Sequence, residues 1–237
     1  MREVVKVKLY RGICVPKLEL STVVDNIYTN GMQGNEGTWK PSVPNVSEIA
    51  SQVEEMFHID ELSRDSIFGN AMNNGIYATA SKNTALYYAT KHNRSVENDS
   101  PILIEFEVDI SSIYIDGRDL LYTVFQSLKC HEDNQSKLEK LISIFGCSIE
   151  RYFNSAVHAS GLEYKLAMAN LACFDQRNVK EHMLNTTTMK GRCGTVFQSA
   201  FVVQAPVLST DIKSCSAVEL GSYIPPKVDV TLDKLLY

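Results

Sequence analysis

Hydrophobic and polar residues alternate along several short stretches of the chain, and this pattern predicts β-strands. Residues 4–12 place valine and leucine between lysines, as in a half-buried strand. An apolar run at 102–110 becomes alternating at its end, and a further apolar triplet at 113–115 precedes an Asp-Gly turn. The β pattern returns at 195–207. We therefore expect strands near both ends of the chain and in its middle.

Apolar residues spaced three to four positions apart predict helices elsewhere. Residues 47–57 open with a serine cap and carry one apolar face, and residues 82–92 read as a helix of about three turns. From about 118 to 190 a helical insertion interrupts the β pattern. Its predicted helices lie at 137–145, 148–158 and 163–173. Residues 15–46 are rich in glycine and proline and predict a loop, with a helical turn around 20–28.

The length and composition suit one globular domain that spans residues 1–237. Of the 237 residues, 44% are hydrophobic and 22% are charged, which is ordinary for a soluble domain. No run approaches the ~18 apolar residues that a membrane span needs. The first residues lack the apolar segment of a signal peptide. We expect a soluble, cytoplasmic protein with no membrane partner.

Neither a metal site nor a strongly basic surface is expected. The six cysteines are scattered without a Cys-x-x-Cys pair, so we interpret them as free thiols. The five histidines are isolated and are predicted to be surface or helix residues. A net charge of −5, without a run of lysine and arginine, mildly disfavours nucleic acid as a partner.

Two tyrosines indicate a pocket for a flat ligand. Tyr77 belongs to a short predicted strand and Tyr88 to the helix that follows, so Tyr88 can project back toward Tyr77. Offset stacking and cation–π attraction each contribute roughly 0.5 to 2 kcal/mol when water is excluded. The pair therefore predicts an aromatic clamp for a planar cation such as nicotinamide.

Two short motifs resemble those of the ADP-ribosyltransferase superfamily. Gly-Ile-Tyr-Ala-Thr-Ala-Ser at 75–81, the tyrosine helix and the apolar strand at 101–108 resemble the diphtheria-toxin and PARP-like branch. Tyr-Arg-Gly at 10–12 resembles the first motif of the arginine-type toxins. The resemblance implies an α+β fold in which a pair of small packed β-sheets surrounds an NAD cleft. It also implies a mono-ADP-ribosyltransferase that uses NAD as a substrate, needs no metal, and transfers ADP-ribose to a macromolecule.

The resemblance assigns roles to individual residues. Arg11 would hold a phosphate or ribose oxygen with its planar guanidinium, and Tyr77 and Tyr88 would sandwich the nicotinamide. Thr79 or Ser81 would offer a hydroxyl to the nucleotide, with capping of the next helix as the alternative role. The implied NAD-binding residues are Arg11, Gly12, Tyr77, Thr79, Ser81 and Tyr88. The implied catalytic positions are those of Arg11, Tyr77, Tyr88, Gln198 and Ala200.

The chain departs from the family pattern in the last motif. Residues 195–207 resemble the last catalytic strand, in which Gln198 would hold the acceptor and a glutamate would follow two positions later. Ala200 stands at that place. Loss of such a group typically costs ~100 to 1,000-fold in rate, so we expect NAD binding with weak or no turnover. The alanine is either an engineered replacement or the mark of a natural pseudoenzyme. Restoring glutamate would raise activity in the first case and change little in the second.

A second Glu-x-Glu pair competes with this assignment. Glu105 and Glu107 lie two residues apart on a predicted strand, so both side chains point to one face. We expect them to be structural, because they directly follow the tyrosine helix, where the family places a structural strand.

Several biological roles fit the resemblance. The chain would be a toxin, effector or phage-defence factor that acts in the cytoplasm or is delivered to a host cytoplasm. The favoured acceptor is a protein, with nucleic acid as the alternative, and an antitoxin or immunity protein would be a further partner. Two other functions use the same cleft. One is a non-catalytic module that holds a nucleotide or a partner, and the other is an NAD glycohydrolase.

Overall fold

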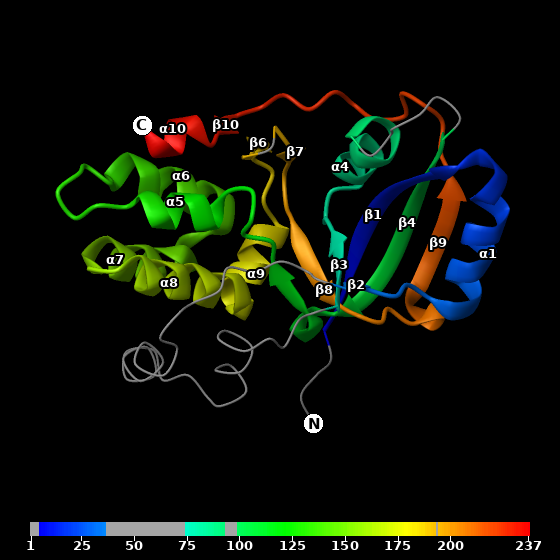
Figure 1. Cartoon of the computed structure of the whole chain (residues 1–237), viewed down its shortest axis with the longest axis horizontal. Helices are drawn as coiled ribbons and strands as arrows, with labels where there is room; N and C mark the ends of the chain where they lie inside the picture. The colour runs from blue at the N-terminus through cyan, green and yellow to red at the C-terminus, as the bar shows by residue number, and fades with distance from the viewer. Residues whose placement is uncertain (1–4, 37–73, 93–98, 193) are drawn as a thin grey trace.

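The computed structural model describes residues 5–36, 74–92, 99–192 and 194–237. The helix predicted at 47–57 lies outside these residues. Short, mostly antiparallel sheets lie beside a block of helices (Figure 1). The α+β class predicted from the sequence is therefore confirmed.

The first sheet contains three antiparallel strands, β1 (Lys6–Pro16), β4 (Asp99–Asp109) and β9 (Ile212–Ala217), in the order β1-β4-β9. Its central strand β4 is largely buried, as its apolar run predicts. The register pairs Arg11 with Ile104. β1 is longer than the predicted strand, because its pairing with β4 continues to Pro16.

The second sheet joins strands that lie far apart in the sequence. Its strands are β2 (Asn35–Glu36), β3 (Asn74–Ala78), β8 (Phe201–Gln204) and β5 (Ile113–Ile115), in the order β2-β3-β8-β5, and all pairs are antiparallel. Tyr10 of β1 and Thr79, just after β3, exchange two backbone hydrogen bonds of 2.8 and 2.9 Å. This bridge ties the two sheets together where the middle of β1 meets the end of β3.

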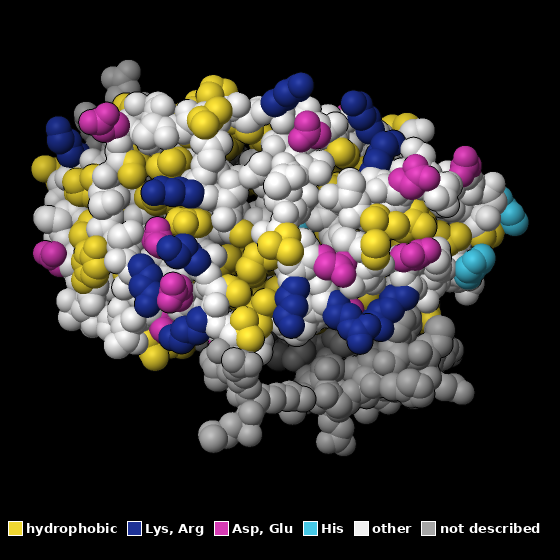
Figure 2. Space-filling model, turned by 180° about the vertical axis from the view of Figure 1, so that it is seen from behind, with side chains coloured by type: hydrophobic (Ala, Val, Ile, Leu, Met, Phe, Trp, Pro, Cys, Tyr) yellow, Lys and Arg dark blue, Asp and Glu magenta, His cyan; other side chains and the backbone are white. Residues whose placement is uncertain are grey.

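Charged side chains pair across the exposed part of the first sheet. Lys8 lies 2.7 Å from Glu105, and Lys213 lies 3.1 Å from Glu107. Basic and acidic side chains are interspersed over the sheet end of the molecule in Figure 2. The Glu-x-Glu pair of β4 is thus engaged in surface ion pairs.

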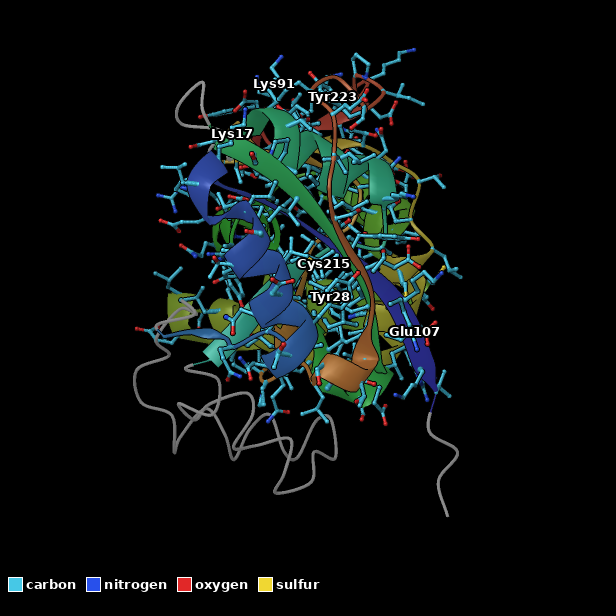
Figure 3. All side chains as sticks on the ribbon, turned by 90° about the vertical axis from the view of Figure 1, so that its right-hand side faces the viewer. Lys17, Tyr28, Lys91, Glu107, Cys215 and Tyr223 are labelled. Atoms are coloured by element: carbon cyan, nitrogen blue, oxygen red, sulfur yellow. The ribbon has the colours of Figure 1, made fainter. Side chains whose placement is uncertain are left out.

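Helix α1 (Leu20–Asn30) packs beside β9 at one edge of the molecule. Its Tyr28 hydroxyl accepts a hydrogen bond of 2.8 Å from the Cys215 backbone N–H (Figure 3). Gly31 ends the helix with a φ of 73°, a conformation that glycine adopts without strain. The helical turn predicted at 20–28 is therefore a complete helix, which interrupts the loop predicted at 15–46.

Helix α4 (Lys82–Tyr87) continues into the π-helical turn η2 (Tyr88–His92). The helix predicted at 82–92 is helical throughout, but its hydrogen-bond pattern changes at Tyr88. α4 packs directly on the backbone of β1. The approach is so close that a Cβ added at Gly12 would lie 1.9 Å from the Ala85 carbonyl oxygen. Glycine at position 12 is what permits this close approach.

The helical block begins and ends near its predicted limits and contains two helices that were not predicted. Its members are α5 (Leu121–Ser127), α6 (Gln135–Phe145), α7 (Glu150–His158), α8 (Leu162–Phe174) and α9 (Gln176–Met183). α8 is buried on nearly all sides along its second half and forms the centre of the block. Side chains of the block and of both main sheets belong to one hydrophobic core.

A small third sheet and the C-terminal helix lie over one side of the helical block. The sheet has the order β10 (Val230–Thr231), β6 (Met189–Lys190), β7 (Val196–Phe197), and α10 (Asp233–Leu236) follows β10. The remaining single turns are η1 (Lys17–Glu19), η3 (Ile110–Ser112), η4 (Cys147–Ile149) and η5 (Ser209–Asp211). In the described ranges, no helix combines the length and the apolar character that crossing a membrane requires.

Candidate functional site

A cavity of about 310 Å³ is lined by residues of β1, β3, α4 and the segment from β7 to β8. This volume is at the lower end of the range for small-molecule sites, roughly 300–1,000 Å³. Residues predicted from the sequence that line it are Arg11, Gly12, Tyr77, Thr79, Tyr88 and Ala200. Residues of the lining that sequence reasoning missed include Asp116, Arg118, Asp119, Thr195 and Ser199. The predicted residues Ser81 and Gln198 lie outside the lining.

Arg118 stacks on the ring of Tyr77, with its guanidinium carbon 4.0 Å from the ring centroid. The Arg118 Nε donates to Oδ1 of Asp116 at 2.8 Å, and Nη2 donates to Oδ2 at 2.6 Å. Burial lowers the pKa of Arg118, but the hydrogen bonds and charge of Asp116 outweigh it and leave this pKa above its ordinary value. A planar cation is thus fixed on the tyrosine ring.

Tyr88 lies at the start of η2 and lines the same cavity. Burial is the main cause that raises the pKa of its phenol, and the negative charges of Asp119 and Asp116 act in the same direction. A hydrogen bond with the Thr195 side chain opposes the shift. The phenol is therefore protonated at neutral pH. Both predicted clamp tyrosines line one cavity, together with two carboxylates.

Arg11 connects the first sheet to the second. Its Nη1 donates to the Tyr77 carbonyl oxygen at 3.0 Å. Burial lowers the pKa of this guanidinium, although arginine remains protonated in proteins. Arg11 also lines a second hollow of about 370 Å³ beside α1, with Asn26 and Gln33. Its charge lies between the two hollows.

A chain of hydroxyl groups fixes the end of β3 to the segment before β8. Thr79 Oγ1 lies 3.1 Å from Ser199 Oγ, which also accepts a hydrogen bond of 3.0 Å from the Ala80 N–H. The Ser81 hydroxyl accepts the Thr84 N–H at 3.2 Å and caps α4. Of the two roles considered for Ser81, the structure gives it the capping one.

The backbone of Ala200 is held on both sides. Its N–H donates to Nε2 of His182 at 3.1 Å, and its carbonyl oxygen accepts the Asp116 N–H at 2.8 Å. The sequence predicted that the histidines are surface or helix residues. His182 lies in helix α9, but it is buried, with 1% of its surface exposed. No pattern around position 182 in the sequence indicated this contact.

Gln198 turns away from the cavity. Its side-chain Nε2 donates to the Thr186 carbonyl oxygen at 3.0 Å, and the backbone carbonyl oxygen of Gln198 accepts a hydrogen bond of 2.6 Å from the Asn185 side chain. Its side chain therefore stabilises the loop before β6 in this conformation.

Asp116 was interpreted from the sequence only as part of an Asp-Gly turn after residues 113–115, and Arg118 was given no role. Their signal was two opposite charges placed directly after an apolar strand, at a point where strand ends carry functional side chains in many folds. Recognising them required knowledge of which strand lies next to β5.

The described residues contain no group of three or more histidine, cysteine, aspartate or glutamate side chains placed to hold a metal ion. The cysteines within the described ranges are free thiols. Comparisons of this chain with protein-family models, with curated proteins and with solved structures found no match.

Proposed function

We propose that this chain is an ADP-ribosyltransferase-type protein that binds NAD, with the nicotinamide and its ribose in the cavity. The observation that supports this most directly is that Arg11, Tyr77 and Tyr88 line one cavity, although they come from three different elements. Two other residues of these motifs have structural roles. Gly12 permits the close approach of α4 to β1, and Ser81 caps α4.

The side chains of the cavity match the needs of NAD cleavage. Nicotinamide leaves NAD with little help from the nucleophile, and its departure generates a ribosyl cation. The site must therefore bind a planar cationic ring and stabilise positive charge on the ribose. Arg118 occupies one face of the Tyr77 ring, so the nicotinamide ring would stack on the other face or take the place of Arg118. Arg11 and Arg118 are both suited to phosphate oxygens.

The proposed reaction is mono-ADP-ribosyl transfer to a macromolecule, with a protein acceptor favoured over a nucleic acid. Gln198, the candidate for holding the acceptor, is bound to Thr186 and would have to exchange that contact for the acceptor. The proposed setting is the cytoplasm, the chain's own or a host's, with an antitoxin or immunity protein as a partner.

The first test is calorimetric titration with NAD. We expect the unmodified chain to bind, Tyr77→Ala to lose the stacking face, and Arg11→Lys to bind more weakly because lysine lacks the planar fork. Glu105→Gln, on the exposed part of the first sheet, is the matched control and should bind like the unmodified chain. Equal binding by all four proteins, or by none, would contradict the proposed site.

Two other functions remain distinguishable by product. A non-catalytic module would bind NAD without releasing nicotinamide, and Ala200 is the observation that favours it. An NAD glycohydrolase would release free ADP-ribose, whereas a transferase would attach ADP-ribose to the acceptor.

A further inference from the structure

We propose that Asp116 supplies the carboxylate that the last strand lacks at position 200, an inference that rests on the proposed function. β5 and β8 are antiparallel, and Ile115 pairs with Phe201. Continuing this register by one position sets Asp116 opposite Ala200, and the Asp116 N–H donates to the Ala200 carbonyl oxygen at 2.8 Å. Opposite residues on antiparallel strands point to the same face, with Cβ atoms about 4.5–5.5 Å apart.

The backbone positions of Asp116 and Ala200 are therefore neighbours, and their side chains leave the sheet on the same face. Both Asp116 and Ala200 line the cavity. A glutamate side chain at position 200 would extend over the same part of the site that the Asp116 carboxylate borders. The function of the missing side chain can thus be taken over by its cross-strand neighbour.

Arg118 fixes the orientation of this carboxylate. Oδ1 of Asp116 accepts the Arg118 backbone N–H at 3.2 Å and Nε at 2.8 Å, whereas Oδ2 accepts Nη2 at 2.6 Å. The Asp116 side chain is 12% exposed, so it is ordered but still borders the cavity. Because the same guanidinium stacks on Tyr77, one ion pair connects the carboxylate to the ring proposed to hold nicotinamide.

The carboxylate retains capacity for a substrate hydroxyl. A carboxylate has about four lone-pair sites, and the three bonds from Arg118 leave one on Oδ2 in the described part of the chain. We assign this site to a hydroxyl of the nicotinamide ribose. The negative charge of Asp116 would then stabilise the ribosyl cation.

The transfer step balances without a further reagent. The bond between ribose C1′ and the nicotinamide nitrogen breaks, and its electron pair leaves with nicotinamide, which becomes neutral. The acceptor, a protein side chain, a nucleobase or water, forms the new bond to C1′ and gives its proton to solvent. Asp116 acts through a hydrogen bond and its charge and forms no covalent bond.

Among the described residues, Asp119 is the other acidic residue that lines the cavity, and its position is less suitable. Its backbone carbonyl accepts the Arg192 N–H at 2.8 Å, and its Cβ packs against Gly191. Its charge acts on the phenol of Tyr88. Asp119 therefore belongs to the wall formed by η2 and the hairpin at β6 and β7, whereas Asp116 belongs to the wall that contains position 200.

The test compares four forms of the full-length chain: unmodified, Asp116→Asn, Ala200→Glu, and the two substitutions together. Asparagine keeps the shape of the side chain and one acceptor oxygen for Arg118 but removes the charge. For each form, NAD affinity is measured by calorimetry and nicotinamide release by its rate at saturating NAD. Asp119→Asn, alone and with Ala200→Glu, is the matched comparison.

We expect Asp116→Asn to bind NAD with similar affinity but to release nicotinamide about 100-fold more slowly. Adding Ala200→Glu should restore most of the lost rate, because it returns a carboxylate to the same place. In the unmodified chain Ala200→Glu should have a smaller effect on the rate, since Asp116 already supplies a carboxylate at this place. Ala200→Glu should not rescue Asp119→Asn.

Four results would overturn the inference. An unchanged rate in Asp116→Asn would show that the carboxylate plays no part. If nicotinamide release by Asp116→Asn fell only because NAD affinity fell, and Ala200→Glu did not restore it, Asp116 would be only a structural partner of Arg118. NAD binding without nicotinamide release by the unmodified chain would leave the binding site in place but remove any catalytic carboxylate. Absence of NAD binding by the unmodified chain would overturn the proposed function as well, which separates that failure from the others.

Discussion

The imidazole of His182 accepts a hydrogen bond of 3.1 Å from the backbone N–H of Ala200, while its Nδ1 bonds the carbonyl oxygen of Ile144. Nε2 is therefore the acceptor, and the ring is neutral with its proton on Nδ1. Through this one side chain, α9 connects α6 to the segment that borders the candidate site. The ring also lies 4.7 Å from Phe145 and 5.3 Å from Phe201, so the connection is buried in the core.

This relationship predicts acid sensitivity. Burial lowers the pKa of His182 from 6.5 to about 4, and the bond to Ile144 opposes the shift only in part. Because the folded state has the lower pKa, the stability contribution is complete above pH 6.5 and is lost as pH falls toward 4. The loss amounts to about 3 kcal/mol. Denaturant unfolding over this pH range should show a shallower dependence for His182→Gln, and parallel curves for the two proteins would contradict the assignment.

Gly12 predicts a packing defect on substitution. A methyl group there would lie 1.9 Å from the Ala85 carbonyl oxygen and 2.8 Å from the Ala89 nitrogen, so α4 must move. We expect Gly12→Ala to lower the free energy of unfolding by about 1–3 kcal/mol and to weaken NAD binding. Thermal unfolding measures the first effect and calorimetry the second.

Gly161→Ala is the matched control for this substitution. The nearest neighbour of its new methyl group is the flexible end of Glu163, 3.1 Å away. It should therefore cost less stability than Gly12→Ala. A larger cost at position 161 than at position 12 would show that the helix contact is not tight.

Asn170 predicts a stabilising substitution. It is 0% exposed in α8, and neither of its amide atoms has a hydrogen-bond partner among the described residues. Replacing it with leucine removes this unsatisfied group, so Asn170→Leu should raise the free energy of unfolding by about 1–3 kcal/mol. Asn178→Leu is the control and should destabilise, because the Asn178 side chain donates to the Ala172 carbonyl at 2.9 Å. A loss of stability in Asn170→Leu would indicate that ordered water satisfies the amide.

Glu105 tests the competing assignment of the carboxylate. Its side chain pairs with Lys8 at 2.7 Å and is not part of the cavity lining. Glu105→Gln should therefore leave the rate of nicotinamide release unchanged, and stability should change little because exposed ion pairs contribute little. A large fall in rate would place the reactive carboxylate on β4 instead of at Asp116, which directly follows β5.

The elements that the sequence predicted well are those with long, regular patterns. β4 and α6 follow from the spacing of their apolar residues, because burying one face leaves a repeat in the sequence. The helix predicted at 163–173 corresponds to α8, a long, mostly apolar segment that is buried on nearly all sides. α5 and α9 were missed, since one is a short apolar run and the other is mostly polar. Helices of this kind are stabilised by packing against neighbours more than by their own sequence.

The sequence by itself determined the α+β class, the segment from β3 through α4 to η2 that carries the two tyrosines, and the Arg-Gly step at positions 11 and 12, within β1. These are local features, set by the spacing of neighbouring residues. The tertiary structure alone decided that Gln198 turns away, that Arg118 covers Tyr77, and that Asp116 lies opposite Ala200. The reason is physical: a strand's register with a distant strand depends on how the whole core packs, and a shift of one residue would move every side chain to the other face.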